Sequence, residues 1–386
     1  MRGGESPDAP IVALPGASRG TAWLCPQSTG PTDSIIPFNN LIYLGKDRMP
    51  GPLLDTLRGS RADPPPVWLM RQAGRYLPEY RALRAHKGGF LALVYDSPSA
   101  AEITLQPIDR FGFDGAILFS DILIVPHAMG QGLEFLAGEG PRLSPPLTYA
   151  RLEAFAARPE RYDAVYETVR LCRRRLPADV TMLGFAGSPW TVATYMIAGE
   201  GSRDQFAARA LAYRDPGACQ AIIDAIAEQT VEYLRGQIEA GAEAVQLFDS
   251  WAGSLAPDEF ERWVVAPNAA ITAALRDSHP DTPVIGFPKG VGAKLPAYAR
   301  ETGVRAVGVD ETIDPVWAAR ELPADMPVQG NLDPLLLLAG SDALEGRIAF
   351  IRRAFEDRPH VFNLGHGIDR RTPIAHVERL LAAVRG

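Results

Sequence analysis

Residues 66–75 read PVWLMRQAGR, and the fold is most readily recognised from this stretch. Val67 and Leu69 alternate with their neighbours as in a short β-strand, which then gives way to a loop that carries Arg71 and Arg75. Gly74 lets the backbone turn tightly between the two arginines. Each guanidinium can bind a carboxylate through two hydrogen bonds, so the loop predicts a clamp for a ligand with several carboxylates. The alternative is a surface loop with two solvated arginines.

Apolar runs of the same kind recur along the chain, with helical patterns between most of them. This order predicts an α/β fold, a single (β/α)8 TIM-type barrel, in preference to a doubly wound open sheet. No linker rich in Pro, Gly or Ser divides residues 50–386, so we expect one domain over residues 49–386, although the pattern alone leaves a second α/β domain open. The eight predicted strands cover residues 67–72, 114–120, 180–186, 244–249, 283–287, 306–310, 327–331 and 360–365.

The clearest helical pattern spans residues 215–241. Asp215 is placed as the N-cap, Pro216 as the first helical residue and Gly241 as the left-handed stop. A shorter helical pattern covers residues 52–57, just after Met49. The apolar residues of the long helix fall mainly on one face, as expected for a helix that packs on a sheet: Ile222, Ile223, Ile226, Leu234 and Ile238.

The first 48 residues differ from the rest of the chain. They contain six prolines, four basic and four acidic residues, and no sustained helical or strand period. They lack the basic start and apolar core of a secretory signal, and a transit peptide would avoid the acidic residues. We therefore expect residues 1–48 to be a disordered extension, and we interpret Met49 as an alternative start.

Composition excludes several classes of function. The chain has 39 Lys and Arg against 46 Asp and Glu, a net charge of −7, whereas a nucleic-acid binder usually has a basic excess. The cysteines, Cys25, Cys172 and Cys219, are too few and too far apart for a disulfide framework or a Cys-x-x-Cys metal pair, so we expect a reducing, cytoplasmic location. No apolar stretch reaches the ~20 residues of a transmembrane helix, so no membrane partner is expected.

Polar and aromatic residues gather where the predicted strands end. In a (β/α)8 barrel the loops after the strands build the active site, so these residues are expected to line one site. Residues 49–386 contain no Walker A sequence, Gly-x-Gly-x-x-Gly, Gly-x-Ser-x-Gly or His-Glu-x-x-His, which leaves nucleotide binding, serine hydrolysis and zinc catalysis without local support. The strand-end residues include Arg71, Arg75, Ser120, Asp121, Tyr195, Asp249, Ser250, Lys289, Asn331, Asp333 and His366.

Residues from about 50 to 386 resemble uroporphyrinogen decarboxylases along their whole length. The runs that carry the resemblance occur in the expected order and form a specific set. They are PVWLMRQAGRYLPEYR (66–81), FSDIL (119–123), GFAGSPWTVATYMI (184–197), VQLFDSWAG (245–253), GFPKG (286–290), QGNLDP (329–334) and FNLGHGI (362–368). The chain departs from some family members at Asp249 and Trp251, where they have glutamate and histidine, so we expect the carboxylate contacts beside Ser250 to differ in detail.

The resemblance implies a single barrel, usually a homodimer, with no metal or organic cofactor. The reaction it implies converts the four acetate side chains of uroporphyrinogen III into methyl groups, which releases carbon dioxide and leaves coproporphyrinogen III for haem biosynthesis. Asp121 and Arg71 match the catalytic positions, with Asp121 accepting the inward-pointing pyrrole N–H groups. The positions that bind the substrate are matched by Arg71, Gln72, Arg75, Asp121, Tyr195, Ser250 and His366, with Arg71, Arg75 and His366 as cations for carboxylates.

Each of these residues also has a structural interpretation. Asp121 and Ser250 could cap helices, and Tyr195 could be a core aromatic residue. His366 between two glycines is a poor packing residue, because glycines there let the backbone approach a ligand. We assign Lys289 no role, and we expect the cysteines to be inert. The identity of the proton donor stays open, since a guanidinium such as that of Arg71 is very hard to deprotonate.

Two other functions fit parts of the pattern. A corrinoid- or thiol-linked methyltransferase on the same barrel would need a zinc site, but Cys172 and Cys219 fall in helical patterns and no thiol lies at a strand end. A tetrapyrrole-binding carrier would need the arginines of the rim but not Asp121. A zinc assay separates the first alternative, and an assay of carbon dioxide release separates the second.

Overall fold

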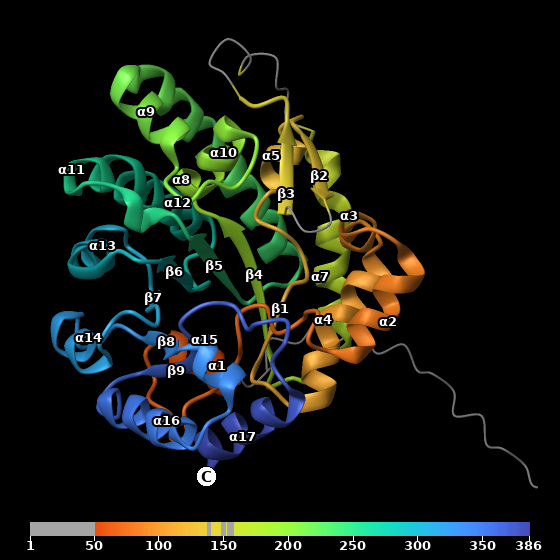
Figure 1. Ribbon diagram of the computed structural model, residues 1–386, viewed down its shortest axis with the longest axis vertical. Helices are drawn as coiled ribbons and strands as arrows, with labels where there is room; N and C mark the ends of the chain where they lie inside the picture. The colour runs from red at the N-terminus through yellow and green to blue at the C-terminus, as the bar shows by residue number, and fades with distance from the viewer. Residues whose placement is uncertain (1–50, 137–139, 148–151, 153–157) are drawn as a thin grey trace, which may run out of the picture. The chain divides into compact units, whose positions relative to one another are not determined.

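A parallel sheet forms the centre of the protein. The computed structural model describes residues 51–136, 140–147, 152 and 158–386, so the extension predicted over residues 1–48 lies outside the described part. The sheet has seven strands in the order β1-β4-β5-β6-β7-β8-β9, and it curls with the helices on its outer side (Figure 1). The strands are β1 (Gly115–Ile117), β4 (Thr181–Gly187), β5 (Ala244–Asp249), β6 (Val284–Pro288), β7 (Ala306–Gly308), β8 (Val328–Leu332) and β9 (His360–Leu364).

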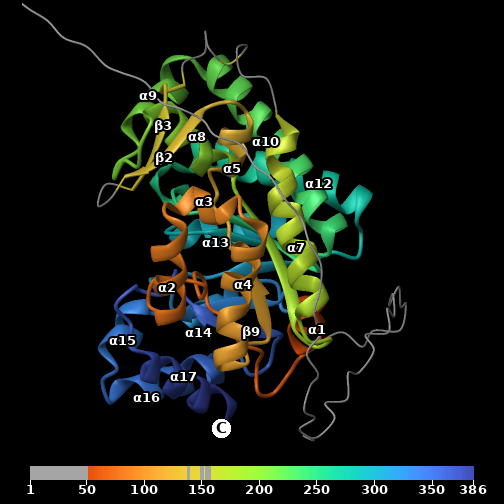
Figure 2. The ribbon, with the colours of Figure 1, turned by 90° about the vertical axis from the view of Figure 1, so that its right-hand side faces the viewer.

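The helices alternate with the strands, as the sequence predicts for a mixed α/β fold. α4 packs on α7, α7 on α10 and α10 on α12, which builds a continuous outer layer along one side of the sheet (Figure 2). The helices are α1 (Pro52–Leu57), α2 (Pro78–Lys87), α3 (Phe90–Val94), α4 (Ser97–Phe111), α5 (Ile124–Ala128), α7 (Asp163–Arg175), α8 (Pro189–Ala198), α9 (Phe206–Arg214), α10 (Pro216–Ala240), α11 (Pro257–Phe260), α12 (Ala266–Ser278), α13 (Leu295–Glu301), α14 (Pro315–Glu321), α15 (Pro334–Ala339), α16 (Ala343–Ala354) and α17 (Ile374–Arg385).

The long helix α10 confirms the prediction made from its ends. The Asp215 carboxylate accepts a hydrogen bond from the Ala218 N–H, which satisfies a backbone donor of the first turn. Gly241 ends the helix with φ of 119°, a conformation that side chains disfavour. The predicted apolar face packs inward, because Ile222, Ile223 and Ile226 are fully buried.

The first predicted strand is shorter than expected. Seven of the predicted strands are confirmed within a few residues, but of residues 67–72 only Val67 pairs, in a parallel bridge with Phe362 of β9. Trp68 N–H still donates to Phe362 O, but the next two backbone donors turn to side chains: Leu69 N–H donates to Gln72 Oε1, and Met70 N–H donates to Asn363 Oδ1. Because side-chain amides take these backbone donors, the ladder cannot continue.

The sequence analysis missed a hairpin between β1 and β4. β2 (Gly132–Leu136) pairs antiparallel with β3 (Gly140–Ser144), and Leu133 lies opposite Leu143. Both leucines are buried, while Glu134 and Ser144 are exposed. The alternation is present in the sequence but covers only five residues in each strand, which is a weak signal.

A chain of buried polar side chains connects distant strands. Trp68 Nε1–H donates to Gln329 Oε1 at 3.0 Å, and Gln329 Nε2–H donates to Gln246 Oε1 at 3.0 Å. Gln246 belongs to β5 and Gln329 to β8, which are separated by β6 and β7 in the sheet. Their side chains meet because the sheet curls around this contact, and all three residues are fully buried.

Replacing Gln329 by leucine tests the importance of this contact. The substitution leaves the Trp68 N–H and the Gln246 carbonyl oxygen buried without partners, so we expect the free energy of unfolding to fall by about 2–4 kcal/mol. Urea unfolding measures it. Gln220→Leu is the control, because Gln220 bonds only to the exposed Asp224 in the same helix, and it should change stability by less than about 0.5 kcal/mol. Equal effects of the two variants would contradict the prediction.

Candidate functional site

Arg71 stands on a tight turn that a neighbouring side chain holds in place. Its φ is 62°, in the left-handed region that residues other than glycine rarely adopt. Gln72 is fully buried, its Oε1 accepts from Leu69 N–H at 2.9 Å, and its Nε2–H donates to Gly115 O at 2.8 Å. These bonds fix the turn and leave the Arg71 side chain exposed at the end of the first strand segment. Gln72 is predicted to bind substrate, but both the oxygen and the nitrogen of its side-chain amide bond to backbone groups.

The loop after β9 packs against Arg71. Ile368 N–H donates to Met70 O at 2.9 Å, which joins the two loops. A Cβ atom on Gly367 would lie only 2.4 Å from Arg71 Cδ, so the arginine stem runs directly over this glycine. The lack of a side chain at Gly367 therefore leaves room for the Arg71 stem, whereas the predicted approach of a ligand to Gly365 and Gly367 stays a prediction.

Asp121 follows β1 and faces the charge of Arg71. Its Oδ1 accepts from Leu123 N–H at 2.9 Å, a local turn of the kind that aspartate commonly makes. Among the described residues no group donates to Oδ2. Desolvation of the carboxyl raises the pKa of Asp121 to about 6, while the Leu123 N–H and the Arg71 guanidinium act to lower it. The carboxylate is therefore mostly ionised at pH 7, with one oxygen available to a ligand.

Tyr195 and Ser250 are both positioned by helix α8, which carries Tyr195 and Thr191. Tyr195, on α8, is half-buried, and its ring lies 6.5 Å from that of Trp251. Burial raises the pKa of Tyr195, and the Asp121 charge adds to this effect, so the two side chains are near each other. Thr191 holds the turn that carries Ser250: Thr191 Oγ1–H donates to the buried Asp249 carboxylate, and Trp251 N–H donates to Thr191 Oγ1 at 3.1 Å.

His366 follows β9 and is half-buried, with its ring stacked on Phe287 at 6.2 Å between centroids. Burial lowers the pKa of His366 to about 3, and the charges of Arg71 and Lys289 act in the same direction. The imidazole is therefore neutral at pH 7. A second positive charge beside Arg71 is disfavoured where water is scarce, so the expectation that His366 binds carboxylates as a cation concerns the ligand-bound site and stays a prediction.

Arg75 is exposed and lies in a cavity rich in arginine. The cavity has a volume of about 640 Å³ and is lined by Arg75, Arg81, Arg84, Ala85, Gly88, Arg370 and Arg371. Arg81 Nη1–H donates to Arg75 O, and Arg371 pairs with Asp369. The sequence reasoning missed Arg370 and Arg84, although Arg370 follows the FNLGHGI run after a single aspartate. This cavity can hold carboxylates near the loop of Arg71.

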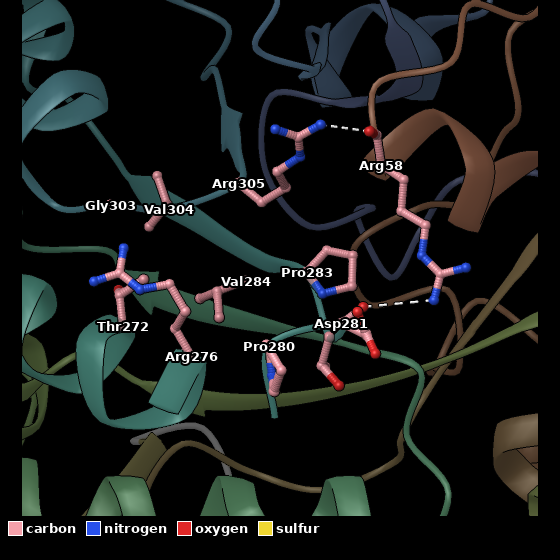
Figure 3. A pocket seen from close by; sticks show the side chains of 11 residues that line it. Arg58, Thr272, Arg276, Pro280, Asp281, Pro283, Val284, Gly303, Val304 and Arg305 are labelled. Carbon is pink, nitrogen blue, oxygen red and sulfur yellow. Dashed lines mark hydrogen bonds between the residues drawn. The ribbon is translucent and has the colours of Figure 1, made fainter. Parts of the chain in front are cut away.

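A second cavity, of about 410 Å³, lies at the opposite end of the sheet (Figure 3). It is lined by Val284, the first residue of β6, and by Arg305, which immediately precedes β7. Arg58 Nη2–H donates to Asp281 O at 3.5 Å, and Arg305 donates to Arg58 O. These arginines brace the backbone at the amino ends of the strands, the face of such folds that serves stability.

The cysteines of the described residues are not placed for chemistry. Cys172 in α7 and Cys219 in α10 are buried, and burial raises the pKa of each thiol to about 12. Within the described part of the chain, no group of three or more His, Cys, Asp or Glu residues is arranged to hold a metal ion. The thiols thus agree with the expectation that they are inert.

Comparison with known proteins gives consistent matches. The family model described as uroporphyrinogen decarboxylase (URO-D) matches residues 50–386. A uroporphyrinogen decarboxylase from Erythrobacter litoralis is 72% identical over 337 residues, which cover 87% of this chain and 99% of the relative. One from Novosphingobium aromaticivorans is 70% identical over 338 residues, with 88% and 99% covered.

Among solved structures, a methyltransferase from Methanosarcina mazei superposes with a TM-score of 0.70 over 86% of this chain and 96% of that chain, at 20% identity. At this identity the likeness concerns the fold alone.

Gly367→Ala tests the contact between the two loops. The added Cβ would displace the Arg71 side chain, so we expect at least a tenfold loss of turnover. The fold should be retained, because Gly367 lies in a loop at the end of the sheet and not in its core. Gly346→Ala is the matched control: Gly346 lies inside α16 with open space around its Cα, and alanine there should be neutral or stabilising. Turnover assays beside thermal melts measure both, and full activity of Gly367→Ala would contradict the contact.

Proposed function

The chain belongs to the uroporphyrinogen decarboxylase family, and we propose that it removes the acetate carboxyl groups of uroporphyrinogen at the site around Arg71 and Asp121. The observation that carries this assignment is the exposed Arg71 side chain, which lies against Gly367 in the loop of His366, together with the Asp121 carboxylate, of which one oxygen is held by Leu123 N–H. One group attracts substrate carboxylates, and the other stabilises a developing cation.

The substrate has eight carboxylates around a flexible ring of four pyrroles. We expect Arg71 to bind one of them bidentately, and Arg75 to bind another from the arginine-rich cavity. Tyr195 and Ser250 donate hydrogen bonds from their hydroxyl groups, and His366 donates from an imidazole N–H. Gln72 acts through the turn it fixes, so we assign it a positioning role.

Each decarboxylation needs an electron sink. A proton added to a pyrrole carbon makes the ring cationic, and the bond between the acetate CH₂ and its carboxylate then breaks. The electron pair of that bond enters the ring as carbon dioxide leaves. A second proton converts the CH₂ into a methyl group, and the ring loses the first proton, so the net reaction consumes one proton for each carbon dioxide released.

Asp121 supplies the electrostatic part of this reaction. Its carboxylate can accept from the pyrrole N–H groups and lies where positive charge develops in the ring. A preorganised charge in a site with little water stabilises such a cation more than bulk solvent does. The substrate ring itself accepts the electrons, so we propose that the reaction proceeds without a metal or organic cofactor.

We propose that residues 49–386 form one closed (β/α)8 barrel, with the segment around Val67 as the eighth strand. Two contacts support closure: the parallel bridge from Val67 to Phe362 of β9, and the hydrogen bond from Asp114 N–H, next to β1, to Val67 O at 2.9 Å. The segment thus lies between the first and last strands of the sheet.

We also propose that the protein works in the cytoplasm, as the unpaired buried thiols of Cys172 and Cys219 favour. Nucleic acid is not among the proposed partners, since the chain carries a net charge of −7. In the described part of the chain, no helix has both the length and the apolar character that crossing a membrane requires.

A homodimer is the assembly that the family resemblance implies. Phe206 and Tyr213 support it, because they lie seven residues apart on α9 and are 66% and 61% exposed, unusual for aromatic side chains. Light scattering of the purified chain should give twice its mass of 41.8 kDa. A stable monomer at micromolar concentration would contradict the proposal.

Asp121→Asn tests the proposed role directly. The substitution keeps the shape and removes the charge opposite the developing cation, so we expect turnover to fall roughly 10²–10³-fold. Chromatography of the porphyrinogens after incubation with uroporphyrinogen measures it. Asp224→Asn, on the exposed side of α10, is the control and should retain full activity. Near-normal turnover of the Asp121 variant would remove Asp121 from the mechanism.

A further inference from the structure

We propose that Lys289 is a further carboxylate-binding residue of this site, which exchanges its resting partner Glu311 for a carboxylate of the substrate. The proposal rests on the proposed function and adds to it a residue that the sequence analysis left without a role. The substrate brings eight carboxylates, and the arginine-rich cavity lies on the side of Arg75, so a carboxylate near the loops after β6 and β7 needs another cation.

The backbone at Lys289 is held rigidly at the carboxyl end of β6. Lys289 N–H donates to Asp249 O at 3.0 Å, and Lys289 O accepts from Gly253 N–H at 3.1 Å. The next residue, Gly290, donates its N–H to Asp310 Oδ2 at 2.7 Å. These bonds connect the loops after β5, β6 and β7, so the backbone that carries the lysine is fixed, and the lysine side chain is 29% exposed.

Lys289 lies beside a residue of the candidate site. Its charge is one of the causes that lower the pKa of His366. Phe287, two residues earlier on β6, stacks on the His366 ring. On the other side, a Cβ atom on Gly365 would lie 2.2 Å from Glu311 N, so the loop of His366 packs directly on the backbone of Glu311. The lysine and the glutamate therefore flank the same loop.

The ion pair between Lys289 and Glu311 is incomplete. Nζ lies 3.5 Å from Oε1, whereas a charge-assisted hydrogen bond is typically about 2.7–2.9 Å. Glu311 Oε2 is buried and has no hydrogen-bond partner among the described residues. An ammonium group has three donors, so Lys289 keeps donors for another acceptor. In the free protein Glu311 thus compensates the charge of Lys289 without using all of its hydrogen-bond donors.

This arrangement gives the two members of the pair opposite effects on substrate binding. Lys289 attracts a substrate carboxylate, whereas Glu311 repels it and competes for the same ammonium group. Removing the lysine charge should weaken binding, and removing the glutamate charge should strengthen it. A salt bridge that served only stability would behave differently, because loss of either partner would harm the fold in the same direction.

Steady-state kinetics with uroporphyrinogen, beside thermal melts, test the proposal. For Lys289→Gln we expect KM to rise roughly 10–100-fold, the size of one lost charge-assisted hydrogen bond, with kcat within about threefold of the parent. For Glu311→Gln we expect KM to fall. Lys289→Arg restores the cation and should keep KM within about threefold.

Lys294→Gln is the matched control. Lys294 lies five residues further on, donates from Nζ to Leu255 O and sits over the ring of Phe260, so its role is structural. It should lower the melting temperature and leave KM unchanged.

Two results would overturn the proposal: an unchanged KM for Lys289→Gln, or a KM that rises equally in the Lys289 and Glu311 variants. Both are read against the parent chain. If the parent releases no carbon dioxide from uroporphyrinogen, the proposed function itself fails, which is a separate outcome.

Discussion

The turn at Arg71 is the constraint on which the candidate site depends, and the buried amide of Gln72 holds that turn. A carboxamide offers both an acceptor and donors, and here its oxygen serves Leu69 while its nitrogen serves Gly115. One side chain thus satisfies two backbone groups at the point where the strand around Val67 stops pairing. Without it, both groups would be buried without partners or the strand would continue. The consequence is an arginine presented at the end of the sheet on a rigid base.

The charge of Arg71 then organises its neighbours. Asp121, whose pKa burial alone would raise further, stays ionised at neutral pH partly because the guanidinium is close. His366 stays neutral mainly because burial lowers its pKa, and the charges of Arg71 and Lys289 act in the same direction. A carboxylate bound between these groups would offset that repulsion and favour protonation of the imidazole. The site therefore offers an anion a few fixed cations and several neutral hydrogen-bond donors. The Asp121 carboxylate is left to contact the centre of the ligand.

The elements that depend on local signals could be predicted from the sequence. The ends of α10 are set by Asp215 and Gly241, which act within their own turns, and the strands with continuous apolar runs were predicted close to their actual bounds. The expectation that a site forms where the strands end also grouped four residues on one side of the molecule: Arg71, Asp121, Tyr195 and His366. The assignment of their roles came from the family resemblance, because residue type and spacing alone allow capping or packing for most of them.

The remainder depends on contacts between residues far apart in the chain. The early end of the first strand requires Asn363 and Gln72 to take backbone donors, which no pattern around Val67 reveals. The neutral state of His366 depends on burial and on two cations from other loops. Lys289 gains meaning only beside Glu311 and the loop of His366, and Gly367 only beside Arg71. Such relations follow from the fold and have no signature in the local sequence.

A crystal structure of the chain with coproporphyrinogen bound is the measurement that tests the central claim most directly. The account predicts pyrrole nitrogens within about 3.2 Å of the Asp121 carboxylate, and a side-chain carboxylate of the ligand on the Arg71 guanidinium. A ligand bound elsewhere, or one whose pyrrole nitrogens all lie out of hydrogen-bonding reach of Asp121, would contradict it.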